Sequence, residues 1–119
     1  MPGKFAVCRL SGGAPVPEWA WSGPFTSVTR TADELSIVCA ADRLPEEHQP
    51  KSPWVCFKLE GPFSFSEVGI LASVIGPLAE SGVPIFALST FDTDYVLVDA
   101  ENVKIALQAL RDAGHQLVS

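Results

Sequence analysis

The chain has 119 residues, of which 47% are hydrophobic and 18% are charged, and its formal net charge at pH 7 is −6. This length suits one compact domain, or two very small units that share a core, and the apolar content argues against a disordered chain. An acidic protein repels phosphate backbones and anionic lipid head groups, so we expect neither a nucleic acid nor a membrane as a partner.

The first half of the chain alternates short strands with proline-rich loops. A strand is predicted where apolar and β-branched residues alternate and where glycine or proline ends the run. The segment APVPEWAWSGP holds three prolines, which limit it to a single helical turn. The predicted strands are residues 4–10, 25–31 and 35–40, and the predicted loops are residues 11–24 and 41–53.

The second half contains longer and more regular elements. Ser64 and Glu67 have the spacing of a capping box, so we expect a helix that begins at Ser64 or Ser66. Gly82 is a typical end for this helix, and Asp99 is a typical N-cap for a second one. The predicted strands are residues 54–60, 83–88, 95–98 and 116–118, and the second helix is residues 100–113.

From residue 54 onward, the predicted order of elements is βαββαβ. Right-handed crossovers in this order place both helices on one face of a four-stranded antiparallel sheet, which is the α+β, ferredoxin-like fold. The first half repeats the order weakly, and its turn at residues 31–35 aligns with residues 90–95, with one residue extra in the second turn. We therefore expect a degenerate, β-rich copy in residues 1–53 and a regular copy in residues 54–119.

A polar corner lies between two apolar strands of the regular copy. Three hydroxyl groups and two carboxylates gather in residues 89–94 (STFDTD), and the start of the first helix, residues 64–69, is also small and polar. We expect these two polar segments to face each other.

Together, the two segments have the groups that a free amino acid needs. Its ammonium group requires a carboxylate, for which Asp94 and Glu67 are candidates, and its carboxylate requires N–H donors, which a helix N-terminus supplies. Gly69 allows the ligand to approach the backbone closely. The sequence therefore predicts a site for a small zwitterion.

Each of these features also has a plainer explanation. Ser64, Ser66 and Glu67 are residues that a helix cap uses without any ligand, and Asp92 and Asp94 are common in solvated hairpin turns. Two carboxylates without further ligands nearby disfavour a calcium or magnesium site. We expect neither a metal nor a cofactor.

Motifs of catalysis and secretion are absent from the sequence. It contains no hydrolase, phosphate-loop, zinc-protease or dinucleotide-binding motif, so we expect no enzymatic activity. Cys8, Cys39 and Cys56 each lie in an apolar run without Cys-x-x-Cys spacing, which predicts buried, reduced thiols. The apolar run before Cys8 is too short for a signal peptide, which predicts a cytoplasmic protein.

The segment EVGILASVIGPLAESGVPIFALSTFDTDYVLVDAENVKIALQALRDAG resembles the ACT domains of the CASTOR type. These domains are related to the regulatory ACT pairs of aspartokinases and to the eukaryotic cytosolic arginine sensors. The resemblance is strong over residues 54–119 and looser over residues 1–53. Its most specific elements are Ser89-Thr90-Phe91-x-x-Asp94-Tyr95-x-Leu97-Val98 and Glu67-Val68-Gly69-Ile70.

The resemblance implies a regulatory module that binds an amino acid and has no chemistry of its own. It also implies a homodimer or higher oligomer, because the arginine sensors use four ACT units in one chain and this chain has two at most. A regulatory role further implies a protein partner that the module regulates. The alternative is a ligand-free assembly module that acts through ACT-type dimerisation. The implied ligand-binding residues are Ser66, Glu67, Val68, Gly69 and Ile70 on one wall of the site, and Thr90, Phe91 and Asp94 on the other.

Overall fold

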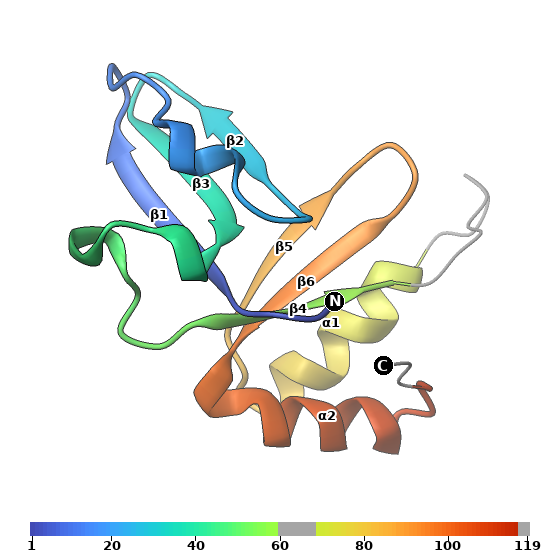
Figure 1. Cartoon of the computed structure of the whole chain (residues 1–119). Helices are drawn as coiled ribbons and strands as arrows, with labels where there is room; N and C mark the ends of the chain where they lie inside the picture. The colour runs from blue at the N-terminus through green and yellow to red at the C-terminus, as the bar shows by residue number, and fades with distance from the viewer. Residues whose placement is uncertain (60–68, 117–119) are drawn as a thin grey trace. The chain divides into compact units, whose positions relative to one another are not determined.

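The computed structural model describes residues 1–59 and 69–116 of the chain. They belong to two compact units: a first unit, Gly3–Trp54, and a second unit, which joins Met1–Pro2 to Val55–Ser119. Each unit contains antiparallel strands (Figure 1).

In the first unit, one strand lies between two others. β3 (Glu34–Ala40) pairs antiparallel with β1 (Phe5–Ser11) on one side and with β2 (Ser27–Arg30) on the other, which gives the order β2-β3-β1. On the other side of β1, Phe5 pairs with Trp54. The loops contain short 3-10 turns, which are η1 (Glu18–Trp21), η2 (Ala41–Arg43) and η3 (Glu46–His48).

The core of the first unit is formed by alternate residues of its strands. Leu35, Ile37 and Cys39 of β3 are fully buried, as the two-residue period of a strand requires. Ala20 of η1 and Leu44, which follows η2, belong to the same core. The proline-rich sequence around η1 explains why a single turn, and not a long helix, forms there.

The strand β4 (Trp54–Lys58) is divided between the two units. Trp54 is the last residue of the first unit, and the remaining residues of β4 belong to the second. Its strand order is β4-β6-β5, and β6 (Asp94–Asp99) pairs antiparallel with β5 (Ile85–Ser89). Of the strands described in this unit, the one that comes last in the sequence therefore lies between the other two, as in a ferredoxin-like sheet.

Two helices connect and follow these strands. α1 (Ile70–Glu80) precedes β5, and α2 (Val103–Asp112) follows β6 after the turn η4 (Ala100–Asn102). Asp99, the predicted N-cap of the second helix, caps this turn instead, because its Oδ1 accepts a 2.7 Å hydrogen bond from the backbone N–H of Glu101, and Asn102 is the residue that precedes α2. Both helices lie on the same side of the strands (Figure 1), so the predicted α+β, ferredoxin-like class is confirmed. None of the described helices has the length and apolar content needed to cross a membrane.

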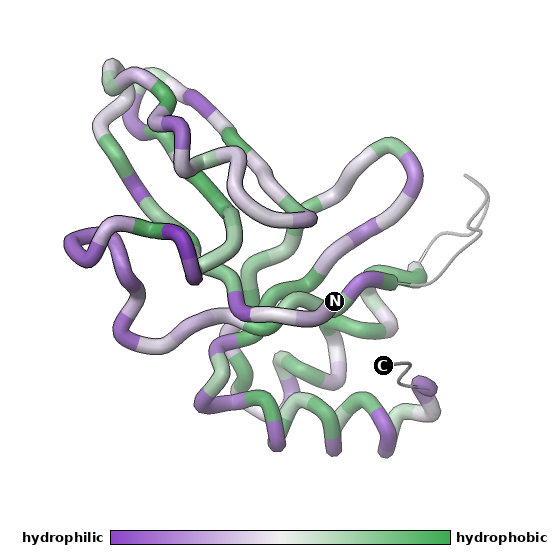
Figure 2. Tube along the Cα trace, viewed as in Figure 1, coloured by the Kyte–Doolittle hydropathy of each residue, from purple (hydrophilic) through white to green (hydrophobic). Residues whose placement is uncertain are grey.

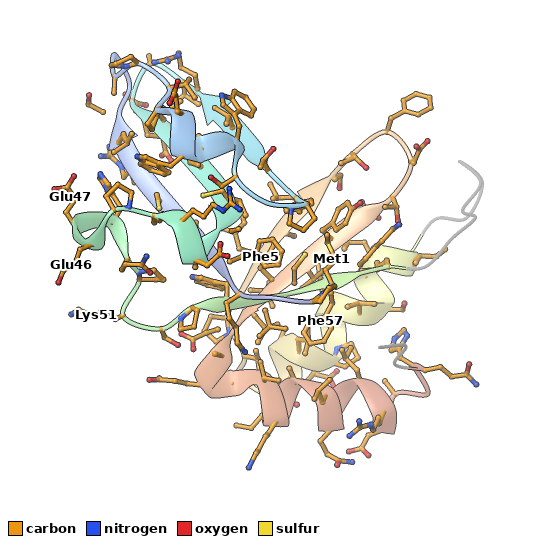
Figure 3. All side chains as sticks on the ribbon, viewed as in Figure 1. Met1, Phe5, Glu46, Glu47, Lys51 and Phe57 are labelled. Carbon is orange, nitrogen blue, oxygen red and sulfur yellow. The ribbon has the colours of Figure 1, made fainter. Side chains whose placement is uncertain are left out.

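The apolar faces of both helices pack against the strands of the second unit. Figure 2 shows hydrophobic and hydrophilic residues alternating along the turns of α2, which is the pattern of a half-buried helix. Phe57 points from β4 toward the helices and packs against this core (Figure 3). The residues of α1, α2 and β6 that are buried in this core are Val74, Leu78, Ala106, Leu110, Val96 and Val98.

One predicted boundary in the second unit is wrong, and another lies almost wholly outside the described residues. α1 begins at Ile70, whereas the predicted starts, Ser64 and Ser66, lie outside the described residues. Gly69 has a φ of 88°, a left-handed conformation through which an α-helix does not continue. Gln116 is not part of a strand, and the other two residues of the predicted last strand lie outside the described part of the chain.

The hairpins of the two units have loops of equal length, so the extra residue expected in the second turn is also wrong. Arg30 pairs with Leu35 in the first unit, and Ser89 pairs with Asp94 in the second. Four residues separate the paired positions in both hairpins.

Candidate functional site

The loop of the β5–β6 hairpin is held closed by one threonine. The backbone N–H of Thr90 donates to the carbonyl oxygen of Thr93 at 2.8 Å, and the Thr90 hydroxyl donates to the same oxygen at 3.0 Å. In return, the Thr93 N–H donates to the Thr90 hydroxyl oxygen at 3.3 Å. These three bonds fix the backbone of the corner.

Ser89 and Asp94 face each other across the base of this loop. The Ser89 hydroxyl donates to Oδ1 of Asp94 at 2.5 Å, and Asp94 is half-buried while Ser89 is exposed. A carboxylate accepts several hydrogen bonds, so Asp94 retains acceptor capacity for a ligand's ammonium or other N–H groups. The corner thus presents an oriented carboxylate at the protein surface.

The corner is attached to the end of β4. The hydroxyl of Thr93 donates to the carbonyl oxygen of Leu59 at 2.6 Å, and the N–H of Leu59 donates to the carbonyl oxygen of Asp94 at 3.0 Å. Leu59 itself is buried in the core of the second unit. The candidate carboxylate therefore lies beside the end of β4, the first strand of the second unit.

The start of α1 provides backbone donors. The first bond inside the helix runs from the N–H of Ser73 to the carbonyl oxygen of Gly69, at 2.9 Å. The amides of residues 70–72 therefore have no partner within the helix, which is the usual state of a helix N-terminus and suits an anion. Gly69 is exposed, and no atom of the described residues lies within 4 Å of a β-carbon built on it.

The structure describes five of the eight predicted ligand-binding residues. Thr90, Phe91 and Asp94 belong to the corner, while Gly69 and Ile70 belong to the start of α1. Phe91 is 85% exposed at the tip of the hairpin, so it does not contribute to the core. Ser66, Glu67 and Val68 lie outside the described residues. That the two walls face each other stays a prediction.

Two residues of the corner were missing from the predicted set. Ser89 orients Asp94, and Thr93 attaches the corner to β4. Both lie next to predicted residues, but their roles depend on the loop length and on the neighbouring strand, which the pattern of a single segment does not contain.

The cysteines are free and buried, as predicted. Burial raises the pKa of Cys8, and it raises the pKa values of Cys39 and Cys56 to about 11. These thiols are therefore protonated at neutral pH and are poor nucleophiles. In the described part of the chain, no three His, Cys, Asp or Glu side chains are grouped so that they could hold a metal ion.

The comparison with known families agrees with this fold. A family model described as an ACT domain matches residues 50–112, and a second model, described as an N-terminal domain, matches residues 3–47. The chain therefore belongs to the ACT-domain family, and the resemblance to the CASTOR type is confirmed.

The curated relatives of the chain include arginine sensors. The cytosolic arginine sensor for mTORC1 subunit 1 from Rattus norvegicus is 33% identical over 119 residues, which cover 87% of this chain and 36% of that protein. The protein of the same name from Homo sapiens is 31% identical over 67 residues, which cover 56% of this chain and 20% of that protein. The chain thus spans about a fifth to about a third of the length of these relatives.

Two solved structures resemble the chain over most of its length. A crystal structure of a protein from Agobacterium tumefaciens is 47% identical, with a TM-score of 0.89, and the match covers 98% of this chain and 87% of that one. A protein of unknown function from Vibrio cholerae is 22% identical, with a TM-score of 0.71, over 92% of this chain and 83% of that one. The second similarity shows a shared fold only.

Proposed function

We propose that the protein is a regulatory module that binds a free amino acid between the β5–β6 corner and the start of α1. The observation that carries this proposal is the Ser89–Asp94 pair, a hydrogen-bonded carboxylate attached to the end of β4. The ACT family and the arginine sensors among the relatives support the same function.

The two ends of an amino acid match the two parts of the site. The ammonium group, or a cationic side chain, binds the carboxylate of Asp94 by charge-assisted hydrogen bonds. The ligand carboxylate accepts from the amides at the start of α1, where the helix dipole favours an anion. The open space at Gly69 leaves the backbone accessible. Ser66, Glu67 and Val68 remain proposed ligand contacts.

The experiment is a thermal-shift screen over the twenty amino acids, followed by calorimetry on any ligand that raises the melting temperature. Arginine is the first ligand to test, because the relatives are named as arginine sensors. Asp94→Ala should abolish the response, and Asp94→Asn should weaken it, because a neutral amide retains one acceptor but loses the charge.

Asp92→Ala is the matched control, since Asp92 is an exposed carboxylate in the same loop. It should leave binding unchanged within about twofold. A folded protein that responds to none of the twenty amino acids, or an Asp94→Ala variant that binds as well as the wild type, would contradict the proposal.

The finer parts of this proposal are supported by the properties that the resemblance implies. We propose that the chain acts as a homodimer or higher homo-oligomer in the cytoplasm, that it reports the ligand to a protein partner, and that it catalyses no reaction. We also propose that residues 1–53 are a degenerate ACT unit and residues 54–119 a regular one.

The second candidate function is a ligand-free assembly module. It is favoured by two large apolar side chains that are exposed in the second unit, Phe91 at 85% and Ile105 at 51%. In this case the protein should form a stable dimer whose melting temperature no amino acid changes. Sedimentation of the wild type and of Ile105→Ser separates the two, because loss of the dimer without any ligand effect supports assembly alone.

A further inference from the structure

The β-hairpins of the two units correspond residue by residue. The pair Arg30–Leu35 in the first unit matches the pair Ser89–Asp94 in the second, which is a constant spacing of 59 residues (30 to 89 and 35 to 94). The same spacing relates η2, which begins at Ala41, to η4, which begins at Ala100. Each position of the candidate site on the second hairpin therefore has a counterpart in the first unit.

The two corners are closed by the same hydrogen bonds. In the first unit, the N–H of Thr31 donates to the carbonyl oxygen of Glu34 at 2.9 Å, and the N–H of Glu34 donates to the Thr31 hydroxyl oxygen at 3.1 Å. Thr90 and Thr93 make the equivalent bonds in the second unit. The backbone of the corner is thus retained in both units.

The chemistry of the two corners differs. Arg30 stands where the second unit has Ser89, and Leu35, which is fully buried, stands where it has Asp94. The first corner therefore has an apolar side chain at the position of the candidate carboxylate and a cation at the position of Ser89.

The Arg30 side chain binds the loop that follows β1. Its guanidinium group donates through Nη1 to the carbonyl oxygen of Gly12 and through Nη2 to that of Ala14, at 2.8 Å for the second bond. A turn holds these two carbonyl groups in place, because the N–H of Ala14 donates to the carbonyl oxygen of Ser11 at 3.0 Å. A planar guanidinium is well suited to two acceptors held in this way.

The same loop also touches the corner directly, at the end of the β2–β3 hairpin (Figure 1). A β-carbon built on Gly12 would lie 2.5 Å from the carbonyl oxygen of Ala32 and 3.0 Å from that of Thr31. Arg9 adds a further bond, from its Nη2 to the carbonyl oxygen of Asp33 at 3.0 Å. The loop and the corner of the first unit are therefore in close backbone contact at Gly12.

We infer that the carbonyl groups of Gly12 and Ala14 form a guanidinium-binding cradle, which Arg30 of the same chain occupies. This cradle is the counterpart of the amino-acid site of the second unit, so each chain binds one free ligand and fills the other position with its own side chain. The part of the inference that concerns stoichiometry rests on the proposed function. The cradle itself does not.

The test is rescue of Arg30→Ala by free guanidinium. Removal of the side chain leaves two carbonyl groups without their donor and should lower the melting temperature by about 3–6 °C. Millimolar guanidinium chloride should restore part of this loss, because a ligand that binds only the folded state stabilises it. Tetramethylammonium chloride, which has the same charge but no N–H donor, should restore none of it.

Arg43→Ala is the matched control, because Arg43 is an exposed arginine at the opposite end of β3. Guanidinium should stabilise it no more than it stabilises the wild type. If guanidinium raises the melting temperatures of the two variants equally, the cradle does not exist. Should Arg30→Ala fail to fold, Arg30→Lys serves in the same comparison, since a lysine keeps the charge but lacks the planar pair of donors.

Calorimetry of the wild type with the amino acid that the thermal-shift screen identifies measures how many ligands each chain binds. One ligand per chain agrees with the inference, and two ligands per chain overturn it. If no amino acid binds, the proposed function fails by itself, and the rescue experiment still decides whether the cradle exists.

Discussion

The hydroxyl group of Thr93 donates a 2.6 Å hydrogen bond to the carbonyl oxygen of Leu59, 34 residues earlier in the chain. This bond joins the loop of the β5–β6 hairpin to the end of β4. Because Asp94 follows Thr93 directly, the bond also determines where the candidate carboxylate lies.

Replacement of Thr93 by valine should loosen the corner. The substitution preserves the shape of the side chain but leaves the Leu59 carbonyl without its donor, so the free energy of unfolding should fall by about 1 kcal/mol. Ligand affinity should fall as well, because Asp94 is no longer held in place. Urea denaturation and calorimetry measure the two effects.

Thr93→Ser is the control, since it retains the hydroxyl group. It should stay within about 0.5 kcal/mol of the wild type. Equal losses in Thr93→Val and Thr93→Ser would show that the methyl group matters and the hydrogen bond does not.

Replacement of Gly12 by alanine should destabilise the first unit. The new methyl group would meet the backbone carbonyl of Ala32, which cannot move aside as a flexible side chain would. We expect a loss of about 1–3 kcal/mol in the free energy of unfolding, the usual cost of overpacking. At the neighbouring Gly13, no atom lies within 4 Å of a built β-carbon, so Gly13→Ala should be close to neutral. A neutral Gly12→Ala would show that the loop does not rest on the corner.

Replacement of Gly69 by alanine should cost stability for a different reason. The site is open, but the φ of 88° is unfavourable for a residue with a β-carbon, by about 1–2 kcal/mol. Gly69→Asn should cost less, because asparagine tolerates the left-handed conformation. If both variants unfold at the same urea concentration as the wild type, the helix does not begin after a left-handed residue.

The buried thiols should make the protein less stable at high pH. The ordinary pKa of such a thiol is 9.0, and burial raises it to about 11 for Cys39 and Cys56 in the folded protein. Below pH 9 the thiols are protonated in both the folded and the unfolded state, so they do not lower the free energy of unfolding. Between about pH 9 and pH 11 only the unfolded chain loses these protons, and the free energy of unfolding should fall.

Urea denaturation at several pH values across this range measures the fall. Cys56→Ala should show a smaller fall than the wild type, because one of the raised thiols is gone. The same burial predicts that a disulfide reagent at pH 8 reacts slowly with the folded protein and rapidly with all three cysteines in urea. Rapid reaction of the folded protein would contradict the burial of these side chains.

The strands were predictable from the sequence because their signal is local. The two-residue spacing of the core residues Leu35, Ile37 and Cys39 in β3, and the apolar run of β4, depend only on the period of a strand. The helix start was not predictable in the same way. Ser64 and Glu67 have the spacing of a cap, whereas the start of α1 depends on the backbone conformation of Gly69.

The corner was recognisable as a polar segment, but its bonds were not. Residues 89–94 supply the hydroxyl and carboxylate groups, yet the pairing of Ser89 with Asp94 depends on a loop of four residues. The contact between Arg30 and Gly12 joins segments 18 residues apart, and a long flexible side chain reaches several such partners. Tertiary structure alone selects among them.

The threonine-closed loops also bear on how the chain folds. Each hairpin is closed by a loop of four residues with its own hydrogen bonds, at Thr31 and at Thr90. Closing so short a loop costs little chain entropy, whereas pairing β1 with β3 must first bring distant segments together. The two hairpins are therefore the natural starting points of folding, one in each unit, and the slower step is the addition of the strand that precedes each hairpin in the chain.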